Sequence, residues 1–181
     1  RRHTRYISVT GVQTCALPIS ALFAKVQQAG NEAYDRAQAL LLLESIVNRI
    51  SANRPAAPCY AITADTGAPY LGVSDDGNTG IPSCEGYGDA SSQARANADL
   101  AEWQLELQGG AEKAGTSNAG GALGARGCVF RDATSGAYTV AVAWQGMSDS
   151  AISANNCGVS RYSSELRRRV VWITLKIATL L

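Results

Sequence analysis

The stretch AYDRAQALLLLESIVNRISANR, residues Ala33–Arg54, decides the fold of this chain. Its apolar residues recur at steps of three and four, which is the spacing of one face of an α-helix. Pro55 ends the pattern, because a proline pushes the residue before it out of the helical region. We therefore predict one long helix over Ala21–Arg54, whose packing face is formed by Val26, Ala33, Ala37, Leu40, Leu43, Val47 and Ile50.

A helix of this length would span about 50 Å, at about 1.5 Å per residue. That is long for a compact domain of this size, so we expect the helix to run into another structure. Its apolar stripe needs a covering layer, which is most simply a sheet.

Downstream of the helix, Pro55–Ser91 is rich in Gly, Pro and Asp and is predicted to be a connection. A second helix is predicted over Ser92–Leu107, because four apolar residues share one of its faces: Ala96, Leu100, Trp103 and Leu107. Gly109–Gly127 is predicted to be an exposed loop. It contains no GxxxxGK pattern, so a phosphate-binding role is not expected.

The last third of the chain carries strand patterns. Strands are predicted over Cys128–Arg131 and Ala137–Gln145, joined by a turn at Thr134–Gly136. The second strand alternates larger apolar residues with smaller ones, which is typical of a half-buried strand. A polar crossing over Ser148–Ser164 then leads to a final strand at Arg168–Thr179. Helices followed by antiparallel strands indicate an α+β domain.

The first residues are of a different kind. VTGVQTCALPI, Val9–Ile19, resembles the translation of a short-read sequencing adapter, and Arg1–Arg5 resembles the translated end of an indexing primer. We expect residues 1–20 not to be native, with Ser20 as a junction codon, and exclude them from the fold. The alternative is a targeting segment, because Arg1-Arg2 and the apolar CALPISA stretch are similar to a signal peptide.

This exclusion changes the charge and the available chemistry. Residues 1–19 contain three arginines and no acidic residue, so their removal leaves 13 basic and 15 acidic residues, a net charge of −2. No basic footprint for nucleic acid remains, and no nucleic-acid partner is expected. The single histidine, His3, is also lost, which removes Ser-His-Asp and Cys-His catalysis and histidine metal ligands.

Four cysteines remain once Cys15 is set aside: Cys59, Cys84, Cys128 and Cys157. They form no CxxC pair, and zinc ligands usually come in close pairs. An even number at wide spacing indicates two disulfides formed in an oxidising compartment. The alternative is four buried free thiols in a cytosolic protein.

Three further groups have two interpretations each. The carboxylates of Asp75, Asp76 and Asp132 could bind calcium, but EF-hand spacing is absent and turns are favoured. Arg167–Arg169 could contact an acidic partner or lipid phosphates, but a solvated strand edge is favoured. The tryptophans could form an exposed binding patch, but at least two are expected in the core: Trp103, Trp144 and Trp172.

Several segments, taken in chain order, resemble the PilV group of type IV pilus minor pilins, also called type IV pilus modification proteins. The helix stretch Ala33–Arg54 resembles the lower half of that family's N-terminal helix. The other segments are DLAEWQ at Asp99–Gln104, YTVAVAWQG at Tyr138–Gly146, CG at Cys157-Gly158 and LRRRVVWITLKI at Leu166–Ile177. Together they cover most of residues 21–181.

The resemblance implies a type IV pilin-like fold, with residues 21–54 as the lower half of the long helix and 55–181 as the globular head. Of the three possible pairings of the four cysteines, we expect Cys59–Cys84, which closes a loop in the connection, and Cys128–Cys157, which lies across the sheet, where family members often place a bridge. The resemblance also implies a subunit without enzymatic activity, cofactor or metal, found in the bacterial inner membrane and periplasm before assembly and in the pilus afterwards. Its partners would be other minor pilins, the major pilin and a tip adhesin.

The chain departs from the family at its start. A family member begins with a basic leader, a glycine and an apolar run with an early glutamate, and none of these is present. We expect Ala21–Lys25 to be the junction with a lost half-helix that would enter the inner membrane. No native stretch reaches the length of about 18 apolar residues that a membrane span needs.

Other hypotheses for the function of this chain stay open. A pseudopilin of a type II secretion system would have the same architecture. A secreted disulfide-bonded binding module would use the helix only for packing. A small exported hydrolase is disfavoured by the missing histidine and the missing G-x-S-x-G motif.

Overall fold

The computed structural model describes residues 10–73, 81–110, 113–114, 117–118 and 121–178, and the side chains of residues 20–73, 81–110 and 121–178. It combines helices with an antiparallel four-stranded sheet, which is the expected α+β class. The chain divides into two compact units, Arg1–Tyr34 and Asp35–Leu181.

The first helix, α1 (Thr10–Ala52), begins upstream of its predicted start at Ala21. It ends two residues before the predicted Arg54, and the short 3-10 helix η1 (Arg54–Tyr60) follows it with Pro55 in its first turn. The pyrrolidine ring suits the first turn of a helix, where a missing N–H costs nothing. Pro55 therefore separates the two helices, as its position predicts.

The buried stripe of α1 is offset from the predicted packing face. Leu43 and Ile50 are buried and Val47 is half-buried, whereas Leu40 is 48 % exposed. Ala33, Ala37 and Val26 are exposed as well. The buried residues are Ala39, Leu42, Leu43, Ile46 and Ile50. The run of four leucines offers two helical stripes one residue apart, and sequence periodicity could not decide which of them faces the core.

The second helix, α2 (Ala90–Leu107), begins two residues before the predicted start. Asp89 caps it, since its carboxylate accepts a hydrogen bond from the backbone N–H of Ser92 at 2.8 Å. The predicted apolar face is confirmed, because all four of its residues are buried: Ala96, Leu100, Trp103 and Leu107.

The main sheet has the order β1-β4-β5-β6, and every neighbouring pair is antiparallel. Its strands are β1 (Leu71–Gly72), β4 (Arg126–Arg131), β5 (Tyr138–Gln145) and β6 (Arg168–Leu175). The three long strands match the predicted ones, although β4 starts earlier and β6 ends before the predicted Thr179. A small hairpin of β2 (Lys113–Ala114) and β3 (Ser117–Asn118) lies where only a loop was predicted.

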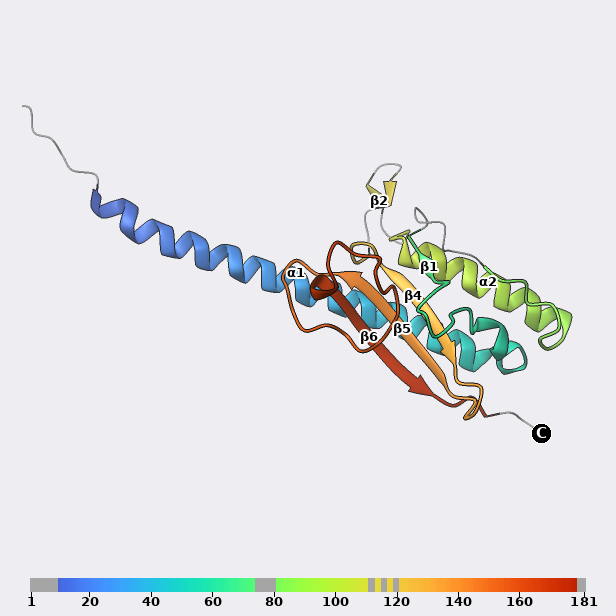
Figure 1. Ribbon diagram of the computed structural model, residues 1–181. Helices are drawn as coiled ribbons and strands as arrows, with labels where there is room; N and C mark the ends of the chain where they lie inside the picture. The colour runs from blue at the N-terminus through green and yellow to red at the C-terminus, as the bar shows by residue number, and fades with distance from the viewer. Residues whose placement is uncertain (1–9, 74–80, 111–112, 115–116, 119–120, 179–181) are drawn as a thin grey trace, which may run out of the picture. The chain divides into compact units, whose positions relative to one another are not determined.

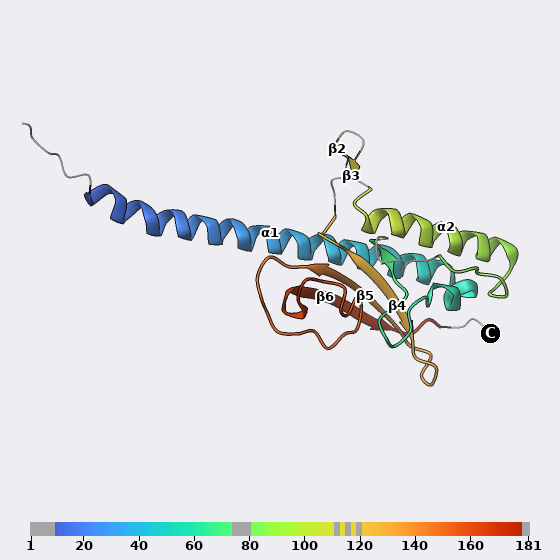
Figure 2. The same cartoon turned by 45° about the horizontal axis from the view of Figure 1, so that its top comes forward.

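Both faces of the sheet are covered. The second unit's part of α1 and α2 lie on one side, and the segment between β5 and β6 lies on the other (Figures 1 and 2). Tyr138, Val140, Val142 and Trp144 belong to the core on the helix side. The alternate residues Ala141 and Ala143 belong to a second cluster with Cys128, Cys157 and Tyr70. The prediction of a half-buried strand is therefore wrong for β5, because the polar crossing folds over its second face.

Candidate interaction surface

The two helices are joined by a cluster of charged side chains around Arg49. Its guanidinium contacts Glu102 at 2.7 Å, Glu106 at 2.7 Å and Asp99 at 3.3 Å, all on α2. The hydroxyl of Ser45 donates to Glu106 at 2.9 Å. The hydrogen bond to Glu102 raises the pKa of Arg49 above its usual value and lowers the pKa of Glu102. Arg49 thus fixes α1 against one face of α2.

A buried set of hydrogen-bonded polar side chains also stabilises the packing of α1 against α2. The hydroxyl of Tyr60 donates to the Asp99 carboxylate, and the amide of Asn53 donates to the Tyr60 oxygen at 3.1 Å and to the carbonyl of Ser92 at 2.8 Å. Burial raises the pKa of Tyr60. Since buried polar groups are costly unless they are paired, these bonds hold α1, η1 and α2 in one arrangement.

The disulfide Cys59–Cys84 connects η1 with the segment that leads into α2. Both cysteines are buried in the main core. This is the pairing expected from the sequence. The bond closes a loop whose described part beyond η1 contains only the two-residue strand β1, and it removes conformational freedom from the unfolded chain.

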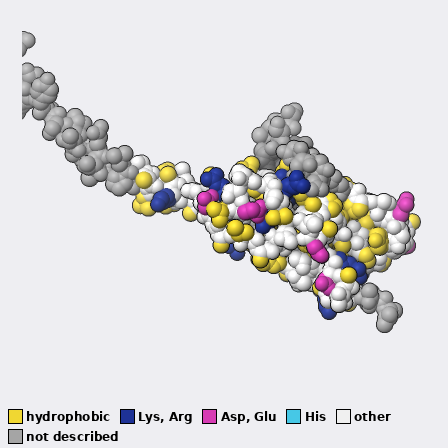
Figure 3. All heavy atoms as spheres, viewed as in Figure 1, with side chains coloured by type: hydrophobic (Ala, Val, Ile, Leu, Met, Phe, Trp, Pro, Cys, Tyr) yellow, Lys and Arg dark blue, Asp and Glu magenta, His cyan; other side chains and the backbone are white. Residues whose placement is uncertain are grey.

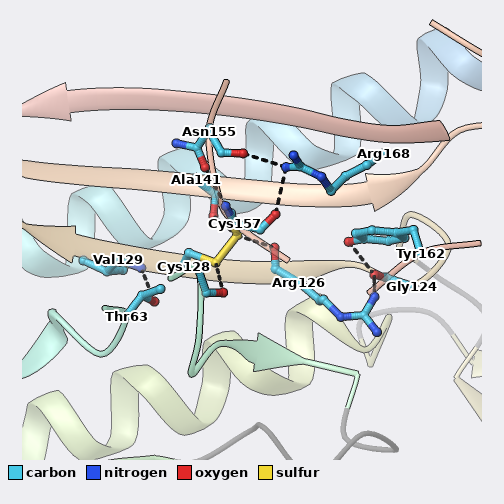
Figure 4. The surroundings of a disulfide bond; sticks show 11 residues. Thr63, Gly124, Arg126, Cys128, Val129, Ala141, Asn155, Cys157, Tyr162 and Arg168 are labelled. Atoms are coloured by element: carbon cyan, nitrogen blue, oxygen red, sulfur yellow. Dashed lines mark hydrogen bonds between the residues drawn. A yellow bond between two sulfur atoms is a disulfide. The ribbon is translucent and has the colours of Figure 1, made fainter. Parts of the chain in front are cut away.

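The disulfide Cys128–Cys157 fastens the covering segment to the second face of the sheet (Figure 4). Cys128 lies on β4 and Cys157 on the segment between β5 and β6, and their Cα atoms are 5.8 Å apart. Both are fully buried. The pairing is again the expected one.

Arg126 lies beside this disulfide and between two aromatic rings. Its guanidinium carbon is 5.3 Å from the Tyr70 ring centre and 4.7 Å from that of Tyr162. Arg126 and the Tyr162 hydroxyl both donate to the carbonyl of Gly124, at 3.0 and 3.1 Å. Burial raises the pKa of Tyr162 to about 12. Sequence patterns gave no signal for this stack, because it joins residues that are distant in the chain.

Arg168 corrects the interpretation of Arg167–Arg169 as a solvated edge. Only 2 % of Arg168 is exposed, and it donates to Glu165 at 2.6 Å. It also donates to three backbone carbonyls of the covering segment: Asn155 at 2.6 Å, Cys157 at 3.1 Å and Ser153 at 3.3 Å. Arg168 and Val170 are two residues apart on β6, so they lie on the same face of the strand, beneath the covering segment. This two-residue spacing was the sequence signal that could have indicated the burial of Arg168.

Arg167 and Arg169 lie nearer the surface. Arg167 forms an exposed ion pair with Asp149 at 3.0 Å. Arg169 donates to the carbonyl of Ser148 at 2.7 Å and to that of Leu166 at 3.0 Å. The arginine run therefore mainly holds the covering segment.

Two of the three tryptophans are core residues. Trp103 and Trp144 are buried, and the Trp103 indole donates to the carbonyl of Leu42 at 2.9 Å. Trp172 on β6 is 50 % exposed, and its neighbour Ile173 is 45 % exposed. Apolar surface is therefore presented along the last strand.

The acidic candidates do not form a metal site in the described structure. The Asp132 carboxylate accepts hydrogen bonds from the backbone N–H groups of Thr134 and Ser135, and the Ser135 bond lowers its pKa. This is the turn function expected of it. Asp75 and Asp76 lie outside the described residues. Among the described residues, no group of three or more potential metal ligands is found.

Two pockets open near the hairpin between β4 and β5. The larger, of about 370 Å³, lies against Phe130, Thr139 and the middle of the covering segment, at Ala154–Asn156. The smaller, of about 260 Å³, is lined by three cations, Arg54, Arg131 and Lys176, together with Tyr138 and Ile177.

Helix α1 carries exposed apolar side chains along its described length. More than half of the surface of each of five residues is open to solvent: Leu22, Phe23, Val26, Tyr34 and Leu41. Figure 3 shows such hydrophobic side chains on the described start of α1. No helix in the described ranges combines the length and apolarity that crossing a membrane requires.

Comparisons of the chain with protein-family models, curated proteins and solved structures give no match.

Proposed function

We propose that this chain is a minor pilin of the PilV type, which acts by assembling into a type IV pilus and not by catalysis. The observation that carries the proposal is the row of large apolar residues that α1 leaves exposed. Exposed apolar surface of this extent is typical of a helix that packs against a partner. A pilin subunit would use this helix to pack against neighbouring subunits.

The arrangement of the head supports the same proposal. The segments that resemble the family form the core elements: Ala33–Arg54 contributes to α1, Asp99–Gln104 to α2 and Tyr138–Gly146 to β5. Helices packed on an antiparallel sheet, with one disulfide beside the helices and another across the second face, are compatible with a pilin-like head.

The partners and location follow from this proposal. The subunit would lie in the inner membrane and periplasm before assembly and in the pilus afterwards. It would contact other minor pilins, the major pilin and a tip adhesin. The exposed residues of α1 would form the contacts with other helices, and the covered sheet would face outward.

Sequencing the source DNA upstream of the codon for Ala21 tests the identity of the first residues. The proposal expects a basic leader, a glycine and a run of about 20 apolar residues with an early glutamate, at the length of a membrane span. A signal peptide with a small-residue cleavage site would instead support the secreted binding module. Genomic DNA that encodes RRHTRYISVTGVQTCALPI in frame would refute the adapter assignment.

Complementation with the recovered full-length gene tests the role of α1. In a strain that lacks the native subunit, we expect the gene to restore surface fibres and the double substitution Val26→Lys with Leu41→Lys to abolish them. The matched control is Leu105→Lys on α2, because Leu105 is also exposed, at 56 %. Equal fibre numbers with the α1 variant and the control would refute the proposed packing surface.

A further inference from the structure

The strand β6 forms one edge of the main sheet. It pairs with β5 along all eight of its residues, from Tyr138↔Leu175 to Gln145↔Arg168. No described strand pairs with its other side, and Figures 1 and 2 show β6 at the margin of the sheet. An edge of this length presents backbone groups that can pair with another extended chain.

The usual protection of an edge strand is missing from the middle of β6. Val170–Leu175 contains no charged residue and no proline. The continuous register with β5 also leaves no bulge. Trp172 and Ile173 point to opposite faces, because they oppose Ala141 and Val140, and each is about half exposed. An added strand would cover both side chains and complete the backbone pairing.

Basic residues stand at both ends of this apolar edge. Arg167 and Arg169 flank its start, where Arg167 also pairs with Asp149 and Arg169 also donates to carbonyls of the covering segment, and Lys176 follows its end. Lys176 also lines the smaller pocket with Arg54 and Arg131, and no acidic side chain lines that pocket. These three cations form no ion pair with another described residue. The end of β6 therefore offers positive charge to an incoming acid.

The charges disfavour a second copy of this chain as the occupant. A two-fold antiparallel pair centred on β6 would place Arg167 of each copy opposite Lys176 of the other. Parallel pairing in register would place every arginine beside its own equivalent. Like charges directly opposite each other destabilise a strand pair.

We propose that the edge of β6 binds, by strand addition, an extended segment of a different protein that is apolar in its middle and acidic at both ends. One acidic end lies at the basic pocket of Arg54, Arg131 and Lys176, and the other lies beside Arg167 and Arg169. The inference concerns the sheet edge and Arg54 of η1, and it does not depend on the role proposed for α1.

The full chain, with both disulfides formed, is titrated with the synthetic peptide EVTVTVTE and with the matched peptide KVTVTVTK. We expect the acidic peptide to slow amide hydrogen exchange over 168–175 and to reduce the quenching of tryptophan fluorescence by succinimide. The quenching reports on Trp172, because Trp103 and Trp144 are buried and the quencher does not reach them. We expect the lysine peptide to bind at least about five-fold more weakly, since surface ion pairs each contribute up to about 1 kcal/mol.

Two variants locate the site and the charge effect. Ile173→Lys is expected to abolish peptide binding, whereas Leu105→Lys, at a comparably exposed position, is expected to leave it unchanged. The double substitution Arg131→Glu with Lys176→Glu is expected to reverse the preference in favour of the lysine peptide. Circular dichroism checks that each variant is folded.

Three results would overturn the inference. The first is unchanged exchange over 168–175 with both peptides. The second is equal affinity for the acidic and basic peptides. The third is concentration-dependent dimerisation in sedimentation experiments with the same protection of β6, which would make a second copy the occupant.

Discussion

Arg168 shows how one side chain can hold a segment that has no regular structure. It reaches three carbonyls and one carboxylate while remaining almost fully buried. A guanidinium suits this position because it presents several donors in one plane. A lysine would offer a single charged group and could not satisfy the same set of acceptors.

We expect Arg168→Ala to lower the free energy of unfolding by about 2–4 kcal/mol, because it leaves buried acceptors unsatisfied. Urea denaturation measures the loss, and hydrogen exchange should accelerate over residues 153–157. Arg167→Ala is the control, since it removes only an exposed ion pair with Asp149 and should cost less than about 1 kcal/mol. Equal losses for the two variants would contradict this role of Arg168.

Gly127 lies directly under two side chains of α2, those of Trp103 and Leu107. A Cβ at this position would be 2.4 Å from Cη2 of Trp103 and 2.6 Å from Cδ1 of Leu107, where α2 crosses β4. Neither the indole nor the leucine can retreat within a filled core. A glycine at this point of β4 therefore allows the close approach of the helix to the sheet.

Gly127→Ala is expected to destabilise the fold by about 1–3 kcal/mol through overpacking. Thermal and urea unfolding measure the change. Gly30→Ala on α1 serves as the matched control, because a Cβ there meets nothing within 4 Å. Alanine favours helix more than glycine does, so this control should not lower stability. A neutral Gly127→Ala would mean that the helix can move away from the sheet.

At the level of residues, repeating patterns could be predicted and individual polar partners could not. The apolar face of α2 and the helix-facing residues of β5 follow from spacing, and the structure buries both sets. Arg126 and Arg168 were not predicted as buried, because an arginine is ordinarily exposed. Their burial depends on acceptors and rings supplied by distant parts of the chain.

Among the elements, α1 and α2 are joined by charge as well as by apolar packing. The Arg49 cluster lies at the margin of the core, where Glu102 is exposed and Glu106 is partly covered. Its acidic members all belong to α2. The junction of the helices therefore depends on carboxylates that remain charged.

The fold should lose stability as the pH falls from about 5 to about 3. The pKa of Glu102 is lowered by Arg49, so the folded state binds this proton less readily than the unfolded state does. Its contribution is complete above the pKa of an unfolded carboxyl, near 4.3, and is lost as the pH falls through the lower folded value. Asp89 and Asp132 act in the same direction through their hydrogen bonds to Ser92 and Ser135.

Urea unfolding at a series of pH values measures this dependence, and Glu102→Gln is expected to make it shallower. Glu85→Gln is the control, because the Glu85 carboxylate forms no ion pair with a described residue. A pH profile that is identical for Glu102→Gln and the unaltered chain would exclude Arg49 as the cause.

The sequence predicts which helices and strands exist better than it predicts which of them pack or pair together. The two helices and the three long strands follow from periodicity, with ends displaced by a few residues. The two-residue strand β1 is too short to give a pattern. The burial of the second sheet face was missed because the covering segment is polar, and only Cys157 and Arg168 reveal that it returns to the sheet.

At the scale of the whole molecule, the core residues that the structure describes all lie in the second unit. The described buried residues begin at Ala39, and both disulfides, α2 and the main sheet follow it. The first unit ends at Tyr34 and contributes no described residue to either core cluster. We therefore expect folding of the head to require only the later part of α1.

Removing residues 1–19 is expected to change the free energy of unfolding of the head by less than about 0.5 kcal/mol, the usual range for changes away from the core. Urea denaturation followed by near-ultraviolet circular dichroism measures it, because the buried tryptophans belong to the head. Removing residues 1–42 is the contrasting variant, since it deletes the core residues Ala39 and Leu42. A large loss with the shorter deletion would mean that the first residues belong to the fold.

The segment that covers the second face of the sheet also has a consequence for how this sequence can diverge. It is attached by the Cys128–Cys157 bond, by Arg168 and by the backbone bond from Gly146 to the carbonyl of Arg167. In the same segment, Met147 and Ile152 are each more than half exposed. Mutations there can change what the molecule displays while selection for folding acts on the attachments alone. The segment can therefore change its surface side chains while its attachments keep it folded over the sheet.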